Sequence, residues 1–190
     1  MTRIVIAFAL MSCVSVLPAE GADSLAEVSY RRSPTFLNGE HVTGVWHLVP
    51  GDTVSTGGGR AYATAKYLDS TRISVMPDAK VVFQQGWVDL IAGPLDIDVV
   101  SGTKHVEQIE SAAGIAVLKS TTGVFSLGEL QADGSREVTF NVKLGEIIFQ
   151  VARDDQAAPL FNVYVGKGGV GSVVVSEGGQ AISAKVTRGS

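Results

Sequence analysis

The chain has 190 residues and a formal net charge of −4 at pH 7, with both signs of charge scattered along it. No basic run is present, which argues against nucleic-acid binding, because a protein that follows a phosphate backbone needs clustered Lys and Arg. The same absence argues against binding to an anionic membrane surface. Glycine is frequent, with 22 residues, whereas aromatic residues make up only 7% of the chain. This composition favours many short strands joined by tight turns.

Residues 1–21 have the features of a secretory signal peptide. Arg3 gives a positive start, residues 4–17 are largely apolar, and small residues close the segment. The apolar run ends at Pro18 and is too short to span a bilayer, which requires about 20 residues. Lipidation at Cys13 is the minor alternative. We therefore predict a signal-peptide helix that is removed, no membrane span in the mature chain, and a periplasmic or secreted protein.

The remaining length corresponds to one domain. Cys13 is the only cysteine, so the mature chain has no means of forming disulfides or thiolate metal sites. Residues 22–41 are polar and include Arg31-Arg32, and we predict an extended lead-in outside the core there. Residues 42–190 are predicted to form a single β domain.

Short strands and turns alternate most clearly in residues 42–83. Residues 60–68 alternate between small or apolar and polar side chains, which is the period of a half-buried strand. The turn signals of this stretch are Pro50-Gly51-Asp52, Gly57-Gly58-Gly59, Asp69-Ser70 and Pro77-Asp78.

The order of these signals resembles the periplasmic domain of the ferric-dicitrate regulator (FecR-type) family. The motif residues that carry the resemblance are Gly51, Asp52, Thr56, Gly57, Asp69 and Ser70. One departure is that Asp69-Ser70-Thr71 stands where the family has Asp-Gly-Ser. The resemblance implies a domain that receives a signal from an outer-membrane receptor and passes it inward. We find no room here for the cytoplasmic anti-sigma segment and membrane span of that family, so we expect a free-standing exported domain.

Beyond residue 83, strand signals recur about every 8 to 12 residues. The expected strands are 87–92, 95–99, 104–109, 115–118, 124–127, 138–142, 147–151, 160–165, 173–175 and 181–186. Gly93-Pro94 is expected to separate the first two, and Asp133-Gly134 is expected to form a primed hairpin turn. The predicted fold is therefore all-β, either a β-solenoid-like stack or a β-sandwich of many short strands.

Two groups of residues could bind an anion or a metal, and each has a simpler interpretation. Gly166 to Ser172 is similar to a phosphate-binding loop, but it lies between two predicted strands without a following helix, so a glycine-rich hairpin is favoured. His41, His47 and His105 have no carboxylate at ligand spacing beside them, so surface histidines are favoured over a metal site. We expect no cofactor.

Paired carboxylates for glycoside chemistry could be supplied by Asp89, Asp96 and Asp98. Asp96 and Asp98 alternate with an apolar residue, however, as on a solvated strand face. Four aromatic residues are either core fillers or a ligand platform, with the core favoured for Trp46. They are Trp46, Trp87, Tyr62 and Tyr164.

The sequence predicts an exported, FecR-like binding or regulatory module of the bacterial cell envelope, non-catalytic, that captures a protein or glycan partner. The alternative is an envelope polysaccharide-active enzyme on a β scaffold. An exposed strand edge offers an extended partner a row of N–H and C=O groups. We expect the lead-in to cover one edge and residues 181–186 to form another.

Overall fold

The protein is an all-β molecule in the computed structural model, which describes residues 24–32, 34–100, 106–151, 162–176 and 181–187. These residues form strands and turns without a helix, as the sequence predicts. It follows that no helix in this part of the chain is long and apolar enough to cross a membrane. The predicted signal peptide and Cys13 lie outside the described residues.

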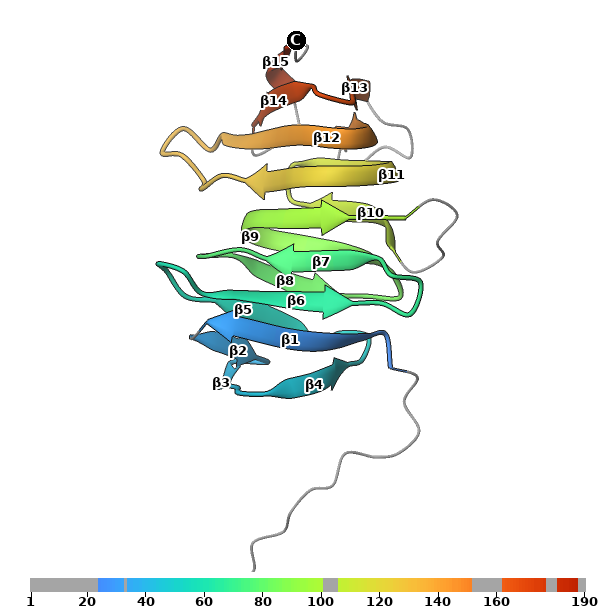
Figure 1. Ribbon diagram of the computed structural model, residues 1–190. Coiled ribbons are helices and arrows are strands. Elements are labelled where there is room, and N and C mark those ends of the chain that lie inside the picture. Colours follow the sequence, from blue (N-terminus) through green and yellow to red (C-terminus); the bar gives the residue numbers. More distant parts are fainter. Residues whose placement is uncertain (1–23, 33, 101–105, 152–161, 177–180, 188–190) are drawn as a thin grey trace, which may run out of the picture.

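The strands are stacked along the long axis of the molecule in two layers (Figure 1). In stacking order, the first sheet consists of β4 (Val45–Leu48), β1 (Ala26–Arg32), β6 (Tyr62–Lys66), β7 (Arg72–Val75), part of β9 (Gly86–Asp98), part of β11 (Gly114–Leu127), part of β12 (Arg136–Gln150), β14 (Val170–Val175) and β15 (Ala181–Thr187). The second sheet consists of β3 (Glu40–His41), β2 (Thr35–Leu37), β5 (Thr53–Thr56), β8 (Lys80–Phe83), the rest of β9, β10 (Val106–Ser111), the rest of β11 and β12, and β13 (Asn162–Gly166).

The register distinguishes between the two predicted architectures. Among the pairings of the described strands, only β9 with β10 is parallel, and the others are antiparallel. A solenoid of repeated coils would place successive strands parallel. The molecule is therefore closer to a β-sandwich whose two layers share strands.

Three long strands belong to both layers. β9 pairs with β8 through residues 88–92 and with β7 through residues 95–98. β11 and β12 cross in the same way and pair with each other on both sides of the crossing. The sequence pattern predicts two shorter strands in place of each of these long strands, and that prediction is wrong. Gly93-Pro94 and the residues between the other paired predictions are corners at which one strand bends from one layer into the other.

The corners require unusual backbone conformations. Gly93, Ser120 and Gly145 have positive φ angles of 76°, 48° and 76°. At Gly145 a Cβ atom would lie 2.0 Å from the carbonyl oxygen of Ser120, so the two crossing strands are in backbone contact there. Thr121 is fully buried at the same corner, and its hydroxyl donates to the carbonyl of Glu146 at 2.6 Å.

The core lies between the layers and is filled by every second side chain of each strand. Its central group is the aromatic cluster of Phe125, Phe140 and Phe149, whose ring centroids are 5.0 to 6.3 Å apart. All three are at most 1% exposed. Each such side chain contributes about 1.5–3 kcal/mol through burial, and all three come from the two strands that pair on both sides of the crossing.

The predicted lead-in is part of this core, which corrects the expectation for residues 22–41. β1 lies between β4 and β6, and Val28 is fully buried. Val28 and Tyr30 alternate with the polar Glu27 and Ser29, which is the two-residue period of a half-buried strand. Asn38 and Gly39, with φ angles of 52° and 86°, form the two-residue primed turn between β2 and β3. The segment therefore forms strands within the two sheets and is not a loose extension that covers a sheet edge.

Two turn predictions also need correction. At Asp133-Gly134 only Gly134 has a positive φ, of 77°, and its N–H donates to the carbonyl of Gln131 at 3.0 Å. This is a type I turn with a glycine bulge. Gly166 to Ser172 does not join a hairpin, because β13 and β14 each pair with β12 and lie in different layers. The glycines allow the chain to cross between the sheets.

The corner at Gly145 provides a test of the shared-strand architecture. We expect Gly145→Ala to lower the free energy of unfolding by about 3 kcal/mol or more, because it combines a strained φ with a backbone clash. Gly166→Ala is the matched control, since a Cβ atom there has no heavy atom within 4 Å. Chemical denaturation followed by circular dichroism measures both. A loss at Gly145 no larger than that of the control would contradict the described corner.

Candidate functional site

Gly51 and Asp52 form a turn that joins three segments. The carboxylate of Asp52 accepts the N–H of Val49 at 2.9 Å and the side-chain amide of Asn38 at 2.8 Å. The side-chain oxygen of Asn38 in turn accepts the N–H of Thr53 at 2.8 Å. Gly51 has a φ of 94°, so the turn requires glycine. The two residues hold β2, β4 and β5 in place.

Thr56 and Gly57 hold a second turn. The buried hydroxyl of Thr56 donates to the carbonyl of Met76 and accepts the N–H of Ala79 at 3.2 Å. A Cβ atom on Gly57 would lie 2.6 Å from Cγ of Pro34. This pair therefore fixes the connection between β7 and β8 against β5.

Asp69 and Ser70 form the third turn, where the chain departs from the FecR-type pattern. Ser70 takes a positive φ of 71°, the conformation that glycine adopts without strain. The carboxylate of Asp69 offsets the strain of this conformation by accepting the N–H of Thr71 at 2.8 Å. All six motif residues thus act in turns, and none of them lines the groove described next.

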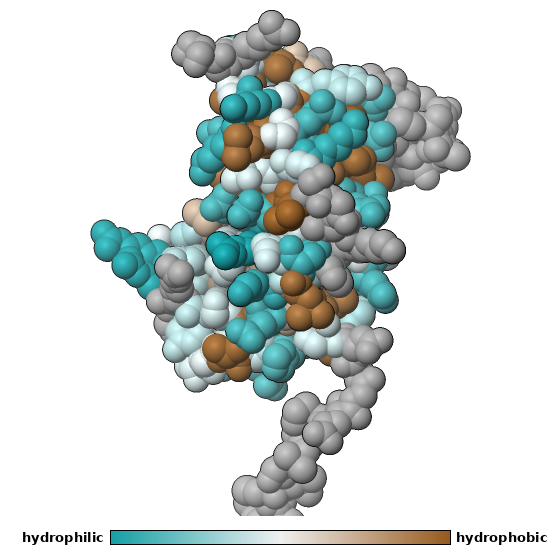
Figure 2. All heavy atoms as spheres, turned by 45° about the vertical axis from the view of Figure 1, so that its right-hand side comes forward, coloured by the Kyte–Doolittle hydropathy of each residue, from teal (hydrophilic) through white to brown (hydrophobic). Residues whose placement is uncertain are grey.

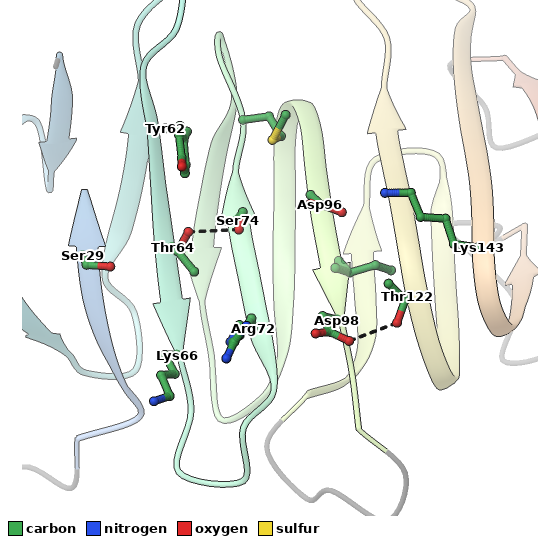
Figure 3. Close-up of a pocket in the computed structure, with 12 residues that line it drawn as sticks. Ser29, Tyr62, Thr64, Lys66, Arg72, Ser74, Asp96, Asp98, Thr122 and Lys143 are labelled. Carbon is green, nitrogen blue, oxygen red and sulfur yellow. Dashed lines mark hydrogen bonds between the residues drawn. The ribbon is translucent and has the colours of Figure 1, made fainter. Parts of the chain in front are cut away.

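A polar groove of about 650 Å³ lies on the outer face of the first sheet (Figure 3). It crosses β1, β6, β7, β9, β11 and β12. Its lining residues are Ser29, Tyr62, Thr64, Lys66, Arg72, Ser74, Met76, Asp96, Ile97, Asp98, Thr122 and Lys143.

The register arranges the groove in rows across the strands. In the first row Ser29, Thr64, Ser74 and Asp96 lie opposite one another on four neighbouring strands. The hydroxyls of Thr64 and Ser74 are 3.0 Å apart and share a hydrogen bond. These side chains are short, which leaves space above the sheet.

The second row is charged. Glu27, Lys66, Arg72 and Asp98 lie opposite one another in that order. Thr122 is next in the row, and its hydroxyl donates to the carboxylate of Asp98 at 3.0 Å. Figure 3 shows this contact beside the side chain of Arg72, with Lys66 on the next strand. The groove therefore combines hydroxyls, carboxylates and cations within reach of one ligand.

The three candidate carboxylates are divided between the two sheets. Asp96 and Asp98 lie in the groove, on one face of β9. Asp89 belongs to the part of β9 in the second sheet, where it accepts Nε1–H of Trp87 at 3.0 Å and the side-chain amide of Gln84 at 3.4 Å. The structure therefore brings together only two of the three.

The two histidines in the described residues lie on different strands. His41 is in β3, with its ring 5.8 Å from that of Phe36, and His47 is in β4, opposite Glu27. His105 lies outside the described residues. In the part of the chain that the structure covers, no three His, Cys, Asp or Glu side chains are grouped to hold a metal.

The four candidate aromatic residues are also dispersed. Trp46 packs against the core and stacks on Tyr30 with ring centroids 6.3 Å apart, which confirms the core prediction. Tyr62 lines the groove, whereas Trp87 and Tyr164 are in strands of the second sheet. On the face seen in Figure 2, hydrophobic residues are scattered among hydrophilic ones. The aromatics therefore form no common platform.

β15 is the end strand that the sequence analysis predicted. It pairs with β14, and within the part of the chain that the structure describes no strand pairs along its second edge. It is seven residues long, and the side chains from Ser183 to Thr187 are all exposed. Lys185 is its only charged residue. At the opposite end of the first sheet, β4 has only four residues.

Comparison with known proteins supports the fold. No protein-family model and no curated protein sequence matches this chain. Among solved structures, a protein described as a "putative anti-sigma factor" from Parabacteroides distasonis ATCC 8503 is similar, with a TM-score of 0.51 and 10% sequence identity. The match covers 72% of this chain and 59% of that chain, so this chain spans about three fifths of its length. At such low identity the likeness shows a shared fold.

The turn at Ser70 yields a prediction about stability. Ser70→Gly should raise the free energy of unfolding by about 0.5–1 kcal/mol, because glycine relieves the positive φ. Ser55→Gly, within β5, should lower it by a similar amount, because the flexibility of glycine is unfavourable in a strand. Thermal and urea denaturation measure both changes. A loss of stability in Ser70→Gly would show that the serine itself supports the turn.

The motif residue Thr56 yields a second prediction. Thr56→Val keeps the shape of the side chain but leaves the N–H of Ala79 without its hydroxyl acceptor, so it should cost about 1–3 kcal/mol. Thr53→Val, on the opposite face of β5, should cost less. Urea denaturation compares the two variants. Equal costs would mean that the buried hydroxyl does not hold the turn.

Proposed function

We propose that this chain is a non-catalytic binding module of the bacterial cell envelope that captures an extended segment of a partner protein. The partner segment adds to the first sheet as a further strand beside β15. Main-chain hydrogen bonds supply the affinity, and neighbouring side chains select the sequence.

The observation that carries this proposal is the open edge of β15. Exposed edges are normally protected by short length, proline, bulges or several charges, since an unprotected edge pairs with other chains. The open edge of β15 has seven residues and a single charge, without proline. A bulge occurs in its pairing with β14 near Val175, which leaves the stretch from Ser183 to Thr187 regular.

The regulatory and envelope parts of the proposal have separate support. The leader sequence at residues 1–21 favours export. The FecR-type turn pattern and the fold shared with a protein described as an anti-sigma factor favour a role in signal reception. Capture of a strand from a receptor is a physical means by which such a domain would sense its partner.

A polysaccharide-active enzyme is the second candidate, and the groove is the observation that favours it. Asp96 and Asp98 are two residues apart on one strand face, so their Cα atoms are about 6.6 Å apart. Glycosidases likewise use two carboxyl groups that flank the bond to be cleaved. The non-catalytic proposal predicts that oligosaccharides remain uncleaved by the protein.

Strand addition predicts different effects of proline at two neighbouring positions of β15. Successive N–H groups of the strand point to opposite edges, one toward β14 and one toward the partner. Of Ser183→Pro and Ala184→Pro, one should lower stability, and the other should leave stability near that of the wild type and abolish partner capture. Thermal denaturation and capture from envelope extract distinguish them.

A photo-reactive amino acid at Ser183 then locates the contact. We expect a crosslink there to one partner segment and none from the same group at Lys80 in the second sheet. If the stable proline variant still captures the partner, strand addition at β15 is wrong.

A further inference from the structure

We infer that the polar groove of the first sheet binds an acidic glycan, a chain of sugars that carries carboxylate groups. This site goes beyond the strand addition proposed above, because the residues that line the groove belong to neither β14 nor β15.

The cations at the centre of the charged row are the first argument. Lys66 and Arg72 lie directly opposite each other on β6 and β7, and both are exposed. Like charges at opposite positions destabilise a sheet. Within the described ranges neither cation has a carboxylate within 4.0 Å, whereas Lys119 and Glu146 do form an ion pair at 3.3 Å. A bound carboxylate between Lys66 and Arg72 would neutralise their repulsion and accept hydrogen bonds from both.

The ends of the charged row restrict which anion fits. Glu27 flanks Lys66 on one side, and Asp98 flanks Arg72 on the other. The hydroxyl of Thr122 holds Asp98 in this position. A dense polyanion such as nucleic acid would meet repulsion at both ends of the row. A single carboxylate bordered by neutral groups avoids that repulsion.

The neighbouring row suits the neutral part of such a ligand. Ser29, Thr64 and Ser74 present hydroxyls, which both donate and accept, and Asp96 accepts. Only one hydrogen bond links Thr64 and Ser74, so each retains capacity for a ligand. Sugar hydroxyls require this mixture of donors and acceptors.

The apolar content of the groove favours sugar over peptide. A peptide in an extended conformation is selected through pockets for alternate side chains. Among the described residues that line the groove, Met76 and Ile97 are the only aliphatic ones, and Ile97 itself is fully buried. Tyr62 lies beyond the hydroxyl row and adds one ring face (Figure 3). The groove therefore has polar contacts along its length and no series of apolar pockets.

Isothermal titration with a tetramer of galacturonic acid tests the inference, with the galactose tetramer as the neutral probe. We expect the acidic tetramer to bind with an affinity that falls as salt rises, and the neutral one to bind at least about tenfold more weakly. Lys66→Gln and Arg72→Gln should each lower the affinity about tenfold or more, because each removes a charge-assisted hydrogen bond. Lys80→Gln, an exposed lysine of the second sheet, is the matched control.

Three further measurements separate the alternatives. Amide chemical shifts should change at Thr64 and Ser74 and not in β15, so this test is independent of strand addition. A peptide of alternating Glu and Ser should fail to compete. Chromatography of the titrated mixture should show the tetramer intact.

The inference is overturned if the acidic tetramer does not bind, or if Lys80→Gln weakens binding as much as Lys66→Gln. It is also overturned if the peptide or the galactose tetramer binds equally well. Cleavage of the tetramer would overturn the inference of a binding site and support the polysaccharide-active enzyme instead.

Discussion

The two layers of this protein share three strands, and the rest of the structure depends on that constraint. Because β9, β11 and β12 each continue from one sheet into the other, the register of the first sheet fixes the register of the second. The corners have no freedom to adjust, since Gly145 is in backbone contact with Ser120 and Thr121 bonds across the bend. The aromatic cluster packs directly inside these crossings. Layer separation, register and core packing are therefore set together.

This arrangement determines where the molecule has room for function. Shared strands cannot leave their sheet without opening the core, so a partner has access only to outward side chains and to the ends of the stack. The outward side chains of the first sheet include the short Ser29, Thr64 and Ser74, and these create the groove. At one end of the stack, β15 has an open edge. The two proposed binding sites are thus the two kinds of surface that a shared-strand sandwich leaves available.

The sequence predicted the strands well and their connections poorly. Two-residue alternation is a local property, so the strand within residues 60–68, which is β6, and the end strand at 181–186 were found almost as the structure has them. Gly93-Pro94 was expected to separate two strands, because the positive φ that glycine adopts serves a turn and a corner equally well. Only pairing with distant strands decides between them. For the same reason the groove was not predictable, since its rows join residues from β1, β6, β7 and β9. Asp96 and Asp98 were noticed, but nothing in the sequence placed them beside Lys66 and Arg72.

The residues that carry the FecR-type resemblance and the residues that line the groove are different sets. Gly51, Asp52, Thr56 and Gly57 all make hydrogen bonds with backbone groups, and these bonds hold the turns. A turn pattern of this kind specifies how a chain folds back on itself, whatever faces outward between the turns. The outward positions of β6 and β7 are free to change without disturbing it. Resemblance in the turns is therefore evidence about architecture, and the ligand must be argued from the strand faces.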